Sequence, residues 1–291
     1  MTNQPDPGDC LVEARATDRY FDYCLQPYEP RRTWRGGLRG ESLLWHSALV
    51  ADATPDTASL FRSVQAHAGA DATVWGVKHI DGRLSWELYF YDSAKEEPRV
   101  HITDLSRGLS PALRITAPCT ERIPYFMWSF DVPPSFRAGD AVPAVSYYLA
   151  DPVGQAGRSY RATEQRTELE NVYHFFHPKR EIREVMARLR SSVFVDWSRV
   201  DLAAVLLPEL FTCRKICVAK KRTADAVYYS GITIDQLLFF LRRFAYPEAL
   251  VSFATAHRDR FEHLLFDVGI DYFVDPEGRV CMPKSGYYST L

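Results

Sequence analysis

The sequence contains none of the short motifs that mark common nucleotide-binding, metalloprotease or serine-hydrolase sites. It has no GxxxxGK[ST], no HExxH, no GxSxG, and no GxGxxG that follows a strand. The six cysteines include no CxxC pair, and a chain of 291 residues does not need disulfides to hold its core, so we expect reduced thiols. His174 and His177 differ in strand parity, and no carboxylate or thiol is spaced to complete a metal site with them. We therefore expect neither a metal nor another cofactor.

The sequence also lacks long apolar runs and a strong net charge. No stretch approaches the roughly 18 consecutive apolar residues that a membrane-spanning helix needs. The N-terminal residues show no basic region followed by an apolar one, as a signal peptide would. The formal net charge of −2 argues against a chain built to coat nucleic acid. We therefore expect a soluble, cytoplasmic protein that has neither a membrane nor nucleic acid as a partner.

The composition is that of an ordinary globular protein with a sizeable core. Hydrophobic residues make up 46% of the chain and charged residues 25%. Residues 27–40 are rich in Pro, Gly and Arg and are typical of an irregular loop. No low-complexity linker divides the rest of the chain. We expect a single domain in which residues 1–54 form an irregular N-terminal segment and residues 55–291 are built from repeated helix and hairpin units.

The repeated unit is helix, helix, strand, strand, and it recurs about every 55 residues in the C-terminal half, a spacing typical of modular folds. Residues 54–69 have a Thr-Pro start and a Gly stop, which predict a helix. Asp81-Gly82 is a strong signal for a hairpin turn. The other expected helices are 178–193, 197–211, 233–244 and 249–269. The other expected hairpins are 215–232 and 270–291. The remaining expected strands are short: 125–132, 144–150, 158–163 and 169–176.

Most of the expected strands have one apolar face and one polar face. In residues 83–91 the apolar set is Leu84, Trp86, Leu88 and Phe90, and the polar set is Arg83, Ser85, Glu87, Tyr89 and Tyr91. In residues 125–132 the apolar face carries Phe126, Trp128, Phe130 and Val132, and the other face carries Tyr125, Met127, Ser129 and Asp131. In residues 215–221 the apolar Ile216 and Val218 oppose Lys215, Cys217, Ala219 and Lys221. An antiparallel sheet open to water on one side shows the same pattern. The many amphipathic helices, and the tendency of eight to ten strands to close, favour a barrel.

We therefore predict an α+β fold, an antiparallel β-barrel built from helix-helix-hairpin repeats, with the helices outside and the polar faces lining the lumen. In element order and strand-face composition, residues 55–291 resemble the ABBA aromatic prenyltransferases, the αββα barrels. The resemblance implies an enzyme that moves a prenyl group from an allylic diphosphate to a small aromatic acceptor, in specialised metabolism and without essential metal. A DDxxD motif is absent, which disfavours the helical, magnesium-dependent isoprenoid synthases.

The resemblance also implies roles for individual side chains. Cations would hold the diphosphate, aromatic faces would shield the allylic cation, and an acid would take up the proton lost on rearomatisation. The diphosphate would fall to Lys78, Arg83, Lys215, Lys221 and Lys284, the shield to Tyr89, Tyr91, Tyr228 and Tyr288, and the acid to Glu87 first and Asp131 second. Not every cation can point inward, since Lys220, Lys221 and Arg222 are consecutive.

A non-catalytic protein on the same scaffold, binding a small molecule or another protein, remains the alternative. The two hypotheses differ in where the cations lie. At least three cations and one acid at one level of the lumen favour the enzyme, whereas scattered cations facing bulk water favour the binding protein.

Overall fold

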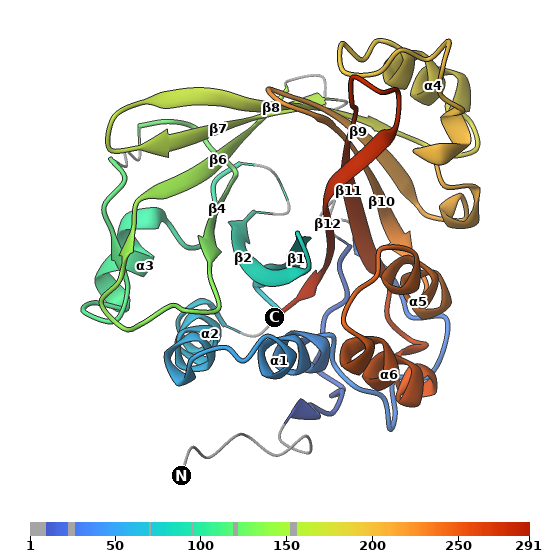
Figure 1. Ribbon diagram of the computed structural model, residues 1–291. Helices are drawn as coiled ribbons and strands as arrows, with labels where there is room; N and C mark the ends of the chain where they lie inside the picture. The colour runs from blue at the N-terminus through green and yellow to red at the C-terminus, as the bar shows by residue number, and fades with distance from the viewer. Residues whose placement is uncertain are drawn as a thin grey trace.

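Ten strands of the chain form a closed antiparallel barrel (Figure 1). The computed structural model describes residues 10–22, 27–69, 71–92, 94, 96–118, 122–151 and 156–291. Around the barrel the strands follow the order β1-β12-β11-β10-β9-β8-β7-β6-β4-β2, and β2 pairs with β1 to close the ring. They are β1 (Thr73–Ile80), β2 (Arg83–Tyr91), β4 (Met127–Val132), β6 (Ala144–Ala150), β7 (Ala156–Thr163), β8 (Thr167–Phe176), β9 (Lys215–Lys221), β10 (Asp225–Ile232), β11 (Phe266–Val274) and β12 (Val280–Thr290). The predicted α+β barrel is confirmed.

Helices lie on the outside of the barrel (Figure 1). In the described part of the chain they are α1 (Glu41–Val50), α2 (Pro55–Ala68), α3 (Ile102–Gly108), α4 (Ile182–Arg190), α5 (Ile234–Arg243) and α6 (Glu248–Ala256). The short strands β3 (Arg114–Ile115) and β5 (Ala141–Val142) form a separate two-stranded sheet. None of the helices in this part of the chain has the length and apolar character needed to cross a membrane.

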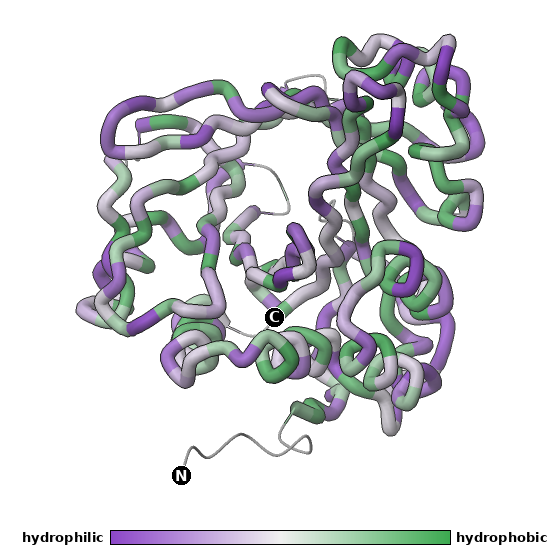
Figure 2. The backbone as a smooth tube through the Cα atoms, in the orientation of Figure 1, coloured by the Kyte–Doolittle hydropathy of each residue, from purple (hydrophilic) through white to green (hydrophobic). Residues whose placement is uncertain are grey.

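The main hydrophobic core lies between the helices and the outer face of the barrel. Hydrophobic and hydrophilic residues alternate along the strands, as Figure 2 shows, so each strand turns one face to this core. Trp86 of β2 is fully buried there, with its ring edge-on to Phe61 of α2 at 5.6 Å. Its indole N–H donates to the Ser47 hydroxyl of α1 at 2.9 Å. The polar faces are thereby left to the lumen.

Several local predictions are confirmed. Asp81 and Gly82 both have positive φ, 49° and 76°, which is the type I′ geometry that a two-residue hairpin requires. The Thr54 hydroxyl accepts the Thr57 N–H at the start of α2. At the start of α5, Thr233 and Gln236 exchange side-chain and backbone hydrogen bonds as a capping box.

Other local predictions are wrong. The helix expected over residues 197–211 is reduced to two 3-10 turns, Leu202–Ala204 and Pro208–Leu210, because Pro208 has no N–H to continue a helix. The helix expected over 249–269 ends at Ala256, and its last residues belong to β11, where Phe266 and Val268 face the core. The segment 1–54 contains α1, whose residues are mostly buried and apolar, so it lacks the periodicity that marks an amphipathic helix.

Candidate functional site

Five tyrosines, one from every second strand, form a closed ring inside the barrel. They are Tyr89 of β2, Tyr148 of β6, Tyr173 of β8, Tyr228 of β10 and Tyr288 of β12. The centroids of neighbouring rings lie 6.1 to 6.4 Å apart around the whole cycle, and each neighbouring pair is tilted or edge-on. We call this ring the tyrosine belt. Side chains from alternate strands also share a layer inside other barrels.

Small residues on the intervening strands make room for the belt. Gly76 of β1 lies opposite Tyr288, and Gly269 of β11 lies opposite Tyr228. A Cβ atom on Gly76 would come within 2.6 Å of the Tyr288 ring, and a Cβ on Gly269 within 2.2 Å of the Tyr228 ring. The other intervening strands carry Ser129, Ser159 and Cys217 opposite belt tyrosines. Ala219 of β9 lies opposite Tyr173, so each large ring has a small neighbour on an adjacent strand.

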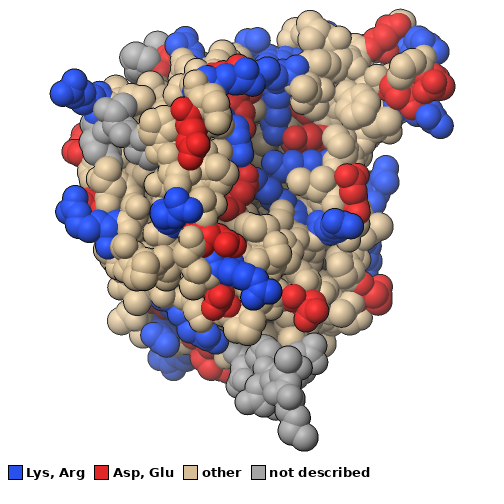
Figure 3. Space-filling view, turned by 60° about the vertical axis from the view of Figure 1, so that its left-hand side comes forward, with Lys and Arg blue, Asp and Glu red and all other residues tan. Residues whose placement is uncertain are grey.

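On one side of the belt lies a cavity of about 350 Å³ lined by charged side chains, which we call the charged chamber. Lys78 of β1 donates to Glu87 of β2 at 2.5 Å and also pairs with Asp131 of β4. Lys221 of β9 pairs with Asp271 of β11, with Nζ–O distances of 2.7 and 2.9 Å. The Lys78–Asp131 and Lys221–Asp271 pairs join strands that are far apart in the sequence. The described surface in Figure 3 is hollowed, with side chains of both charges around the hollow.

Burial and neighbouring charges act in opposite directions on the Lys78–Glu87 pair. Burial alone disfavours both charged forms, but the carboxylates of Glu87 and Asp131 outweigh it and raise the pKa of Lys78. Lys78 and Lys284 likewise lower the pKa of Glu87. The Ser129 hydroxyl donates to Glu87 at 2.5 Å. Glu87 is therefore a fixed carboxylate at the floor of the charged chamber.

Lys284 of β12 is the third lysine of the charged chamber and differs from the other two. In the part of the chain that the structure describes, Lys284 makes no hydrogen bond and no ion pair. Burial, together with the positive charges of Lys78 and Lys221, lowers its pKa from 10.5 to about 8. Asp271 and Glu87 act in the other direction but are outweighed.

The far wall of the charged chamber is built by β6, β7 and β8. A register shift in β8 pairs Asn171 with Ser159 and Leu169 with Tyr160, so Glu170 is the extra residue. Glu170 lines the chamber and accepts from the Ser146 hydroxyl at 3.0 Å. The Asn171 amide donates to the Ser159 hydroxyl and, at 2.8 Å, to the Tyr173 hydroxyl. This wall therefore fixes part of the tyrosine belt.

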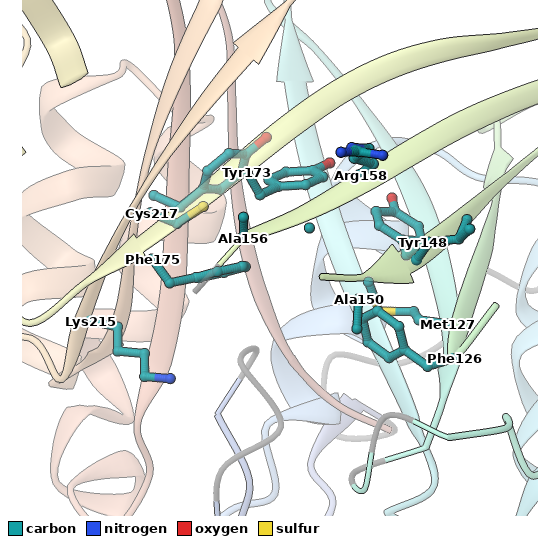
Figure 4. A pocket seen from close by; sticks show the side chains of 13 residues that line it. Phe126, Met127, Tyr148, Ala150, Ala156, Arg158, Tyr173, Phe175, Lys215 and Cys217 are labelled. Atoms are coloured by element: carbon teal, nitrogen blue, oxygen red, sulfur yellow. The ribbon is translucent and has the colours of Figure 1, made fainter. Parts of the chain in front are cut away.

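On the other side of the belt lies a smaller apolar cavity of about 50 Å³, the apolar chamber. Figure 4 shows Phe175 below Tyr173 on one side of this cavity, Phe126 and Met127 below Tyr148 on the other, and Lys215 at its edge. Tyr148, Tyr173 and Tyr228 line both chambers. The belt therefore divides the lumen into a charged part and an apolar part.

The charged chamber brings together most of the side chains named from the sequence. Lys78, Lys221 and Lys284 meet there with Glu87 beside the belt, and they are joined by Tyr89, Tyr228 and Tyr288. Asp131 lies at the rim, where it pairs with Lys78 and, at 3.6 Å, with Arg161. Three cations and one acid thus share one part of the lumen.

Three of the named residues lie elsewhere. Lys215 lines the apolar chamber, on the other side of the belt from Lys221. Arg83, at the start of β2, is exposed and lines neither chamber. Tyr91 is buried but also lines neither chamber. The expected faces of 125–132 also change at their start, because β4 begins at Met127: Phe126 lies against the lumen cluster, and Tyr125 lies in the outer core.

Sequence reasoning missed Tyr148, Tyr173, Asn171 and Arg161 as chamber residues. The period of two would have found the first three. Ser146 and Tyr148 share one face of β6, and Asn171, Tyr173 and Phe175 share one face of β8. Among the described residues, no group of three or more His, Cys, Asp or Glu side chains is placed to hold a metal ion.

No protein-family model matches the chain, and no curated protein matches it in sequence. The two chambers and the belt between them are the features that bear on function.

Gly269→Ala tests the packing of the tyrosine belt. Because the new methyl group would lie 2.2 Å from the Tyr228 ring, we expect the free energy of unfolding to fall by about 1–3 kcal/mol, as overpacking does. Gly157→Ala is the control, since its Cβ would meet only ordinary contacts, the nearest at 3.5 Å. Urea denaturation measures both. Equal stability changes in the two variants would contradict the described packing.

Lys284→Met tests the lowered pKa of Lys284. The folded pKa of about 8 lies below 10.5, so the unfolded chain binds the extra proton between these pH values, and wild-type stability rises with pH across that window. At pH 7 the full cost of burying the protonated Lys284 is present in the folded state. We therefore expect Lys284→Met to be more stable than the wild type by about 1–2 kcal/mol. The difference should shrink from pH 8 to 10. Denaturant titrations at several pH values measure this stability difference, with the exposed Lys179→Met as the control. A stability difference that does not change with pH would contradict this account.

Proposed function

We propose that the chain is an aromatic prenyltransferase-like enzyme that moves a prenyl group from an allylic diphosphate to a small aromatic acceptor. The observation that supports it best is the meeting of Lys78, Lys221 and Lys284 with Glu87 directly beside the tyrosine belt. Cytoplasmic location is part of the same proposal.

In this proposal the diphosphate lies in the charged chamber. The three lysines would stabilise the negative charge that develops on the leaving group, because preorganised cations in a secluded site act strongly on such charge. Lys284 matters most, since in the described chain it has no carboxylate to share its charge. The other two lysines would exchange part of their interaction with Glu87 and Asp271 for the ligand.

The allylic group would lie against the tyrosine belt. Aromatic faces stabilise a cation and exclude water that would otherwise capture it. The belt supplies five such rings in a closed cycle. An aromatic acceptor would enter from the charged chamber, the larger of the two cavities.

Glu87 would accept the proton that the acceptor loses on rearomatisation. Its lowered pKa makes it a weak base, but a protonated arene is a strong acid, so a weak base is sufficient. The hydrogen bond from Ser129 holds the carboxylate in place. Asp131 is a less suitable base because it lies at the rim, paired with Lys78 and Arg161.

A second candidate is a non-catalytic protein that binds a small molecule in the same chamber. The observation that favours it is the balance of charge. The chamber is lined by five basic side chains, Lys78, Arg161, Lys221, Arg222 and Lys284, and by four acidic ones, Glu87, Glu168, Glu170 and Asp271. Lys78 and Lys221 are already paired. Such a site also suits a ligand of low net charge.

Ligand binding separates the two candidates. We expect dimethylallyl diphosphate to raise the melting temperature by several degrees, because a ligand at 100 times its Kd adds about 2.7 kcal/mol. Inorganic phosphate should have little effect. Lys221→Met should weaken binding at least about tenfold, the loss of roughly one charge-assisted hydrogen bond. Lys215→Met, on the other side of the belt, is the matched control and should bind normally. A flat panel of allylic diphosphates would favour the second candidate.

Glu87→Gln tests the proposed base. The amide keeps the shape of the side chain and removes a negative charge, so diphosphate binding should be kept or improved. Turnover should fall about 10²-fold, the usual contribution of a positioned base. The readouts are calorimetric Kd and product formation with a panel of aromatic acceptors. Equal losses in binding and turnover would refute the assigned role.

A further inference from the structure

Lys284 has the surroundings of a reactive amine rather than those of a structural lysine. The two other lysines of the charged chamber are each held by a carboxylate, Lys78 by Glu87 and Lys221 by Asp271. Within the described ranges Lys284 has no such partner, and it is partly exposed to a cavity of about 350 Å³. A small molecule in the chamber can therefore approach its amine.

The charges that face Lys284 come from four different strands. Lys78 of β1 and Lys221 of β9 disfavour its protonated form, whereas Asp271 of β11 and Glu87 of β2 favour it. Together with burial, the two lysines prevail, and the pKa of Lys284 falls to about 8. A substantial fraction of the side chain is then the neutral amine at mildly alkaline pH. An amine placed next to other cations in a secluded pocket is a known way to activate a lysine.

We propose that Lys284 forms an imine with a small aldehyde or ketone that enters the charged chamber. The amine lone pair forms a bond to the carbonyl carbon, and the C=O π electrons move to the oxygen. A proton passes from the nitrogen to that oxygen, and a second proton lets it leave as water. The product is an iminium, and no oxidant or reductant is needed.

The chamber has a group for the second proton step and groups that face the charge of the product. The ammonium group of Lys221 can supply the second proton to the departing oxygen. The carboxylates of Glu87 and Asp271 face the iminium charge, as they face the lysine ammonium before the reaction. This inference does not depend on prenyl transfer, because it uses only the amine of Lys284 and the space beside it.

Reductive trapping tests the proposal on the full chain. The protein is incubated with glyoxylate and cyanoborohydride, which reduces an iminium to a stable secondary amine. Peptide mapping by mass spectrometry then gives the rate of modification at each lysine. At pH 8 we expect Lys284 to react at least about tenfold faster than the exposed Lys179, because far more of it is the neutral amine. Its rate should reach half its maximum near pH 8.

Two variants test whether the neighbouring cation Lys221 causes the reactivity of Lys284. Lys221→Met removes a neighbouring cation and frees Asp271 to pair with Lys284, so labelling of Lys284 at pH 8 should fall severalfold. Lys215→Met, in the apolar chamber, should leave it unchanged. Circular dichroism and melting temperature check that each variant is folded. If Lys221→Met does not fold, the wild-type pH profile decides the question alone.

The possible outcomes also separate this inference from the proposed enzyme. Labelling of Lys284 no faster than that of Lys179, or with the same pH midpoint, would overturn the proposal. Rapid labelling that inorganic diphosphate suppresses would support both the imine site and the diphosphate site. Rapid labelling that diphosphate leaves unchanged would support the imine site and count against the diphosphate site.

Discussion

Each ring of the tyrosine belt lies in the lumen of this barrel opposite a small residue on an adjacent strand. The ten strands allow this arrangement five times, with tyrosines on alternate strands. Gly76 lies opposite Tyr288, Gly269 and Cys217 opposite Tyr228, Ser129 opposite Tyr89, Ser159 opposite Tyr148 and Ala219 opposite Tyr173. The result is a layer of phenol rings across the barrel. The proposed prenyl transfer depends on this layer, because it separates charged side chains from an apolar pocket.

The charges on one side of the layer are arranged at a cost to stability. A buried ion pair returns little net stability, since desolvation offsets the attraction. Lys78 and Lys221 are at least satisfied by carboxylates, but Lys284 is held near two like charges without a partner in the described chain. Perturbed groups of this kind cluster at functional sites. The unfavourable position of Lys284 therefore supports the proposal that the chamber binds a ligand.

The alternation of residue types predicted much of the fold. It assigned the faces of β2 and β9 correctly, and the turn residues placed the hairpins. The helices were harder, because the sequence 197–211 is apolar enough for a helix but contains Pro208, and α1 is buried on most sides and so shows no amphipathic pattern. Local patterns do not reveal which neighbour a segment will pack against.

The sequence predicted only part of the site, and the reason why the rest was missed is geometric. A period of two tells which face of a strand a residue occupies but not how deep in the barrel it lies. Lys215 and Lys221 share one face of β9, yet the belt lies between them. Tyr91 and Arg83 share the face of Glu87 but lie outside both chambers. Depth depends on strand register, which is set by pairing between distant parts of the chain.

A crystal structure of the full chain would test the central claim most directly. The account predicts a closed barrel in which the rings of Tyr89, Tyr148, Tyr173, Tyr228 and Tyr288 form one cycle, with neighbouring centroids 6.1 to 6.4 Å apart. Ordered water should lie against Lys284 on one side of that cycle. An open sheet, or rings turned away so that one undivided channel runs through the barrel, would contradict it.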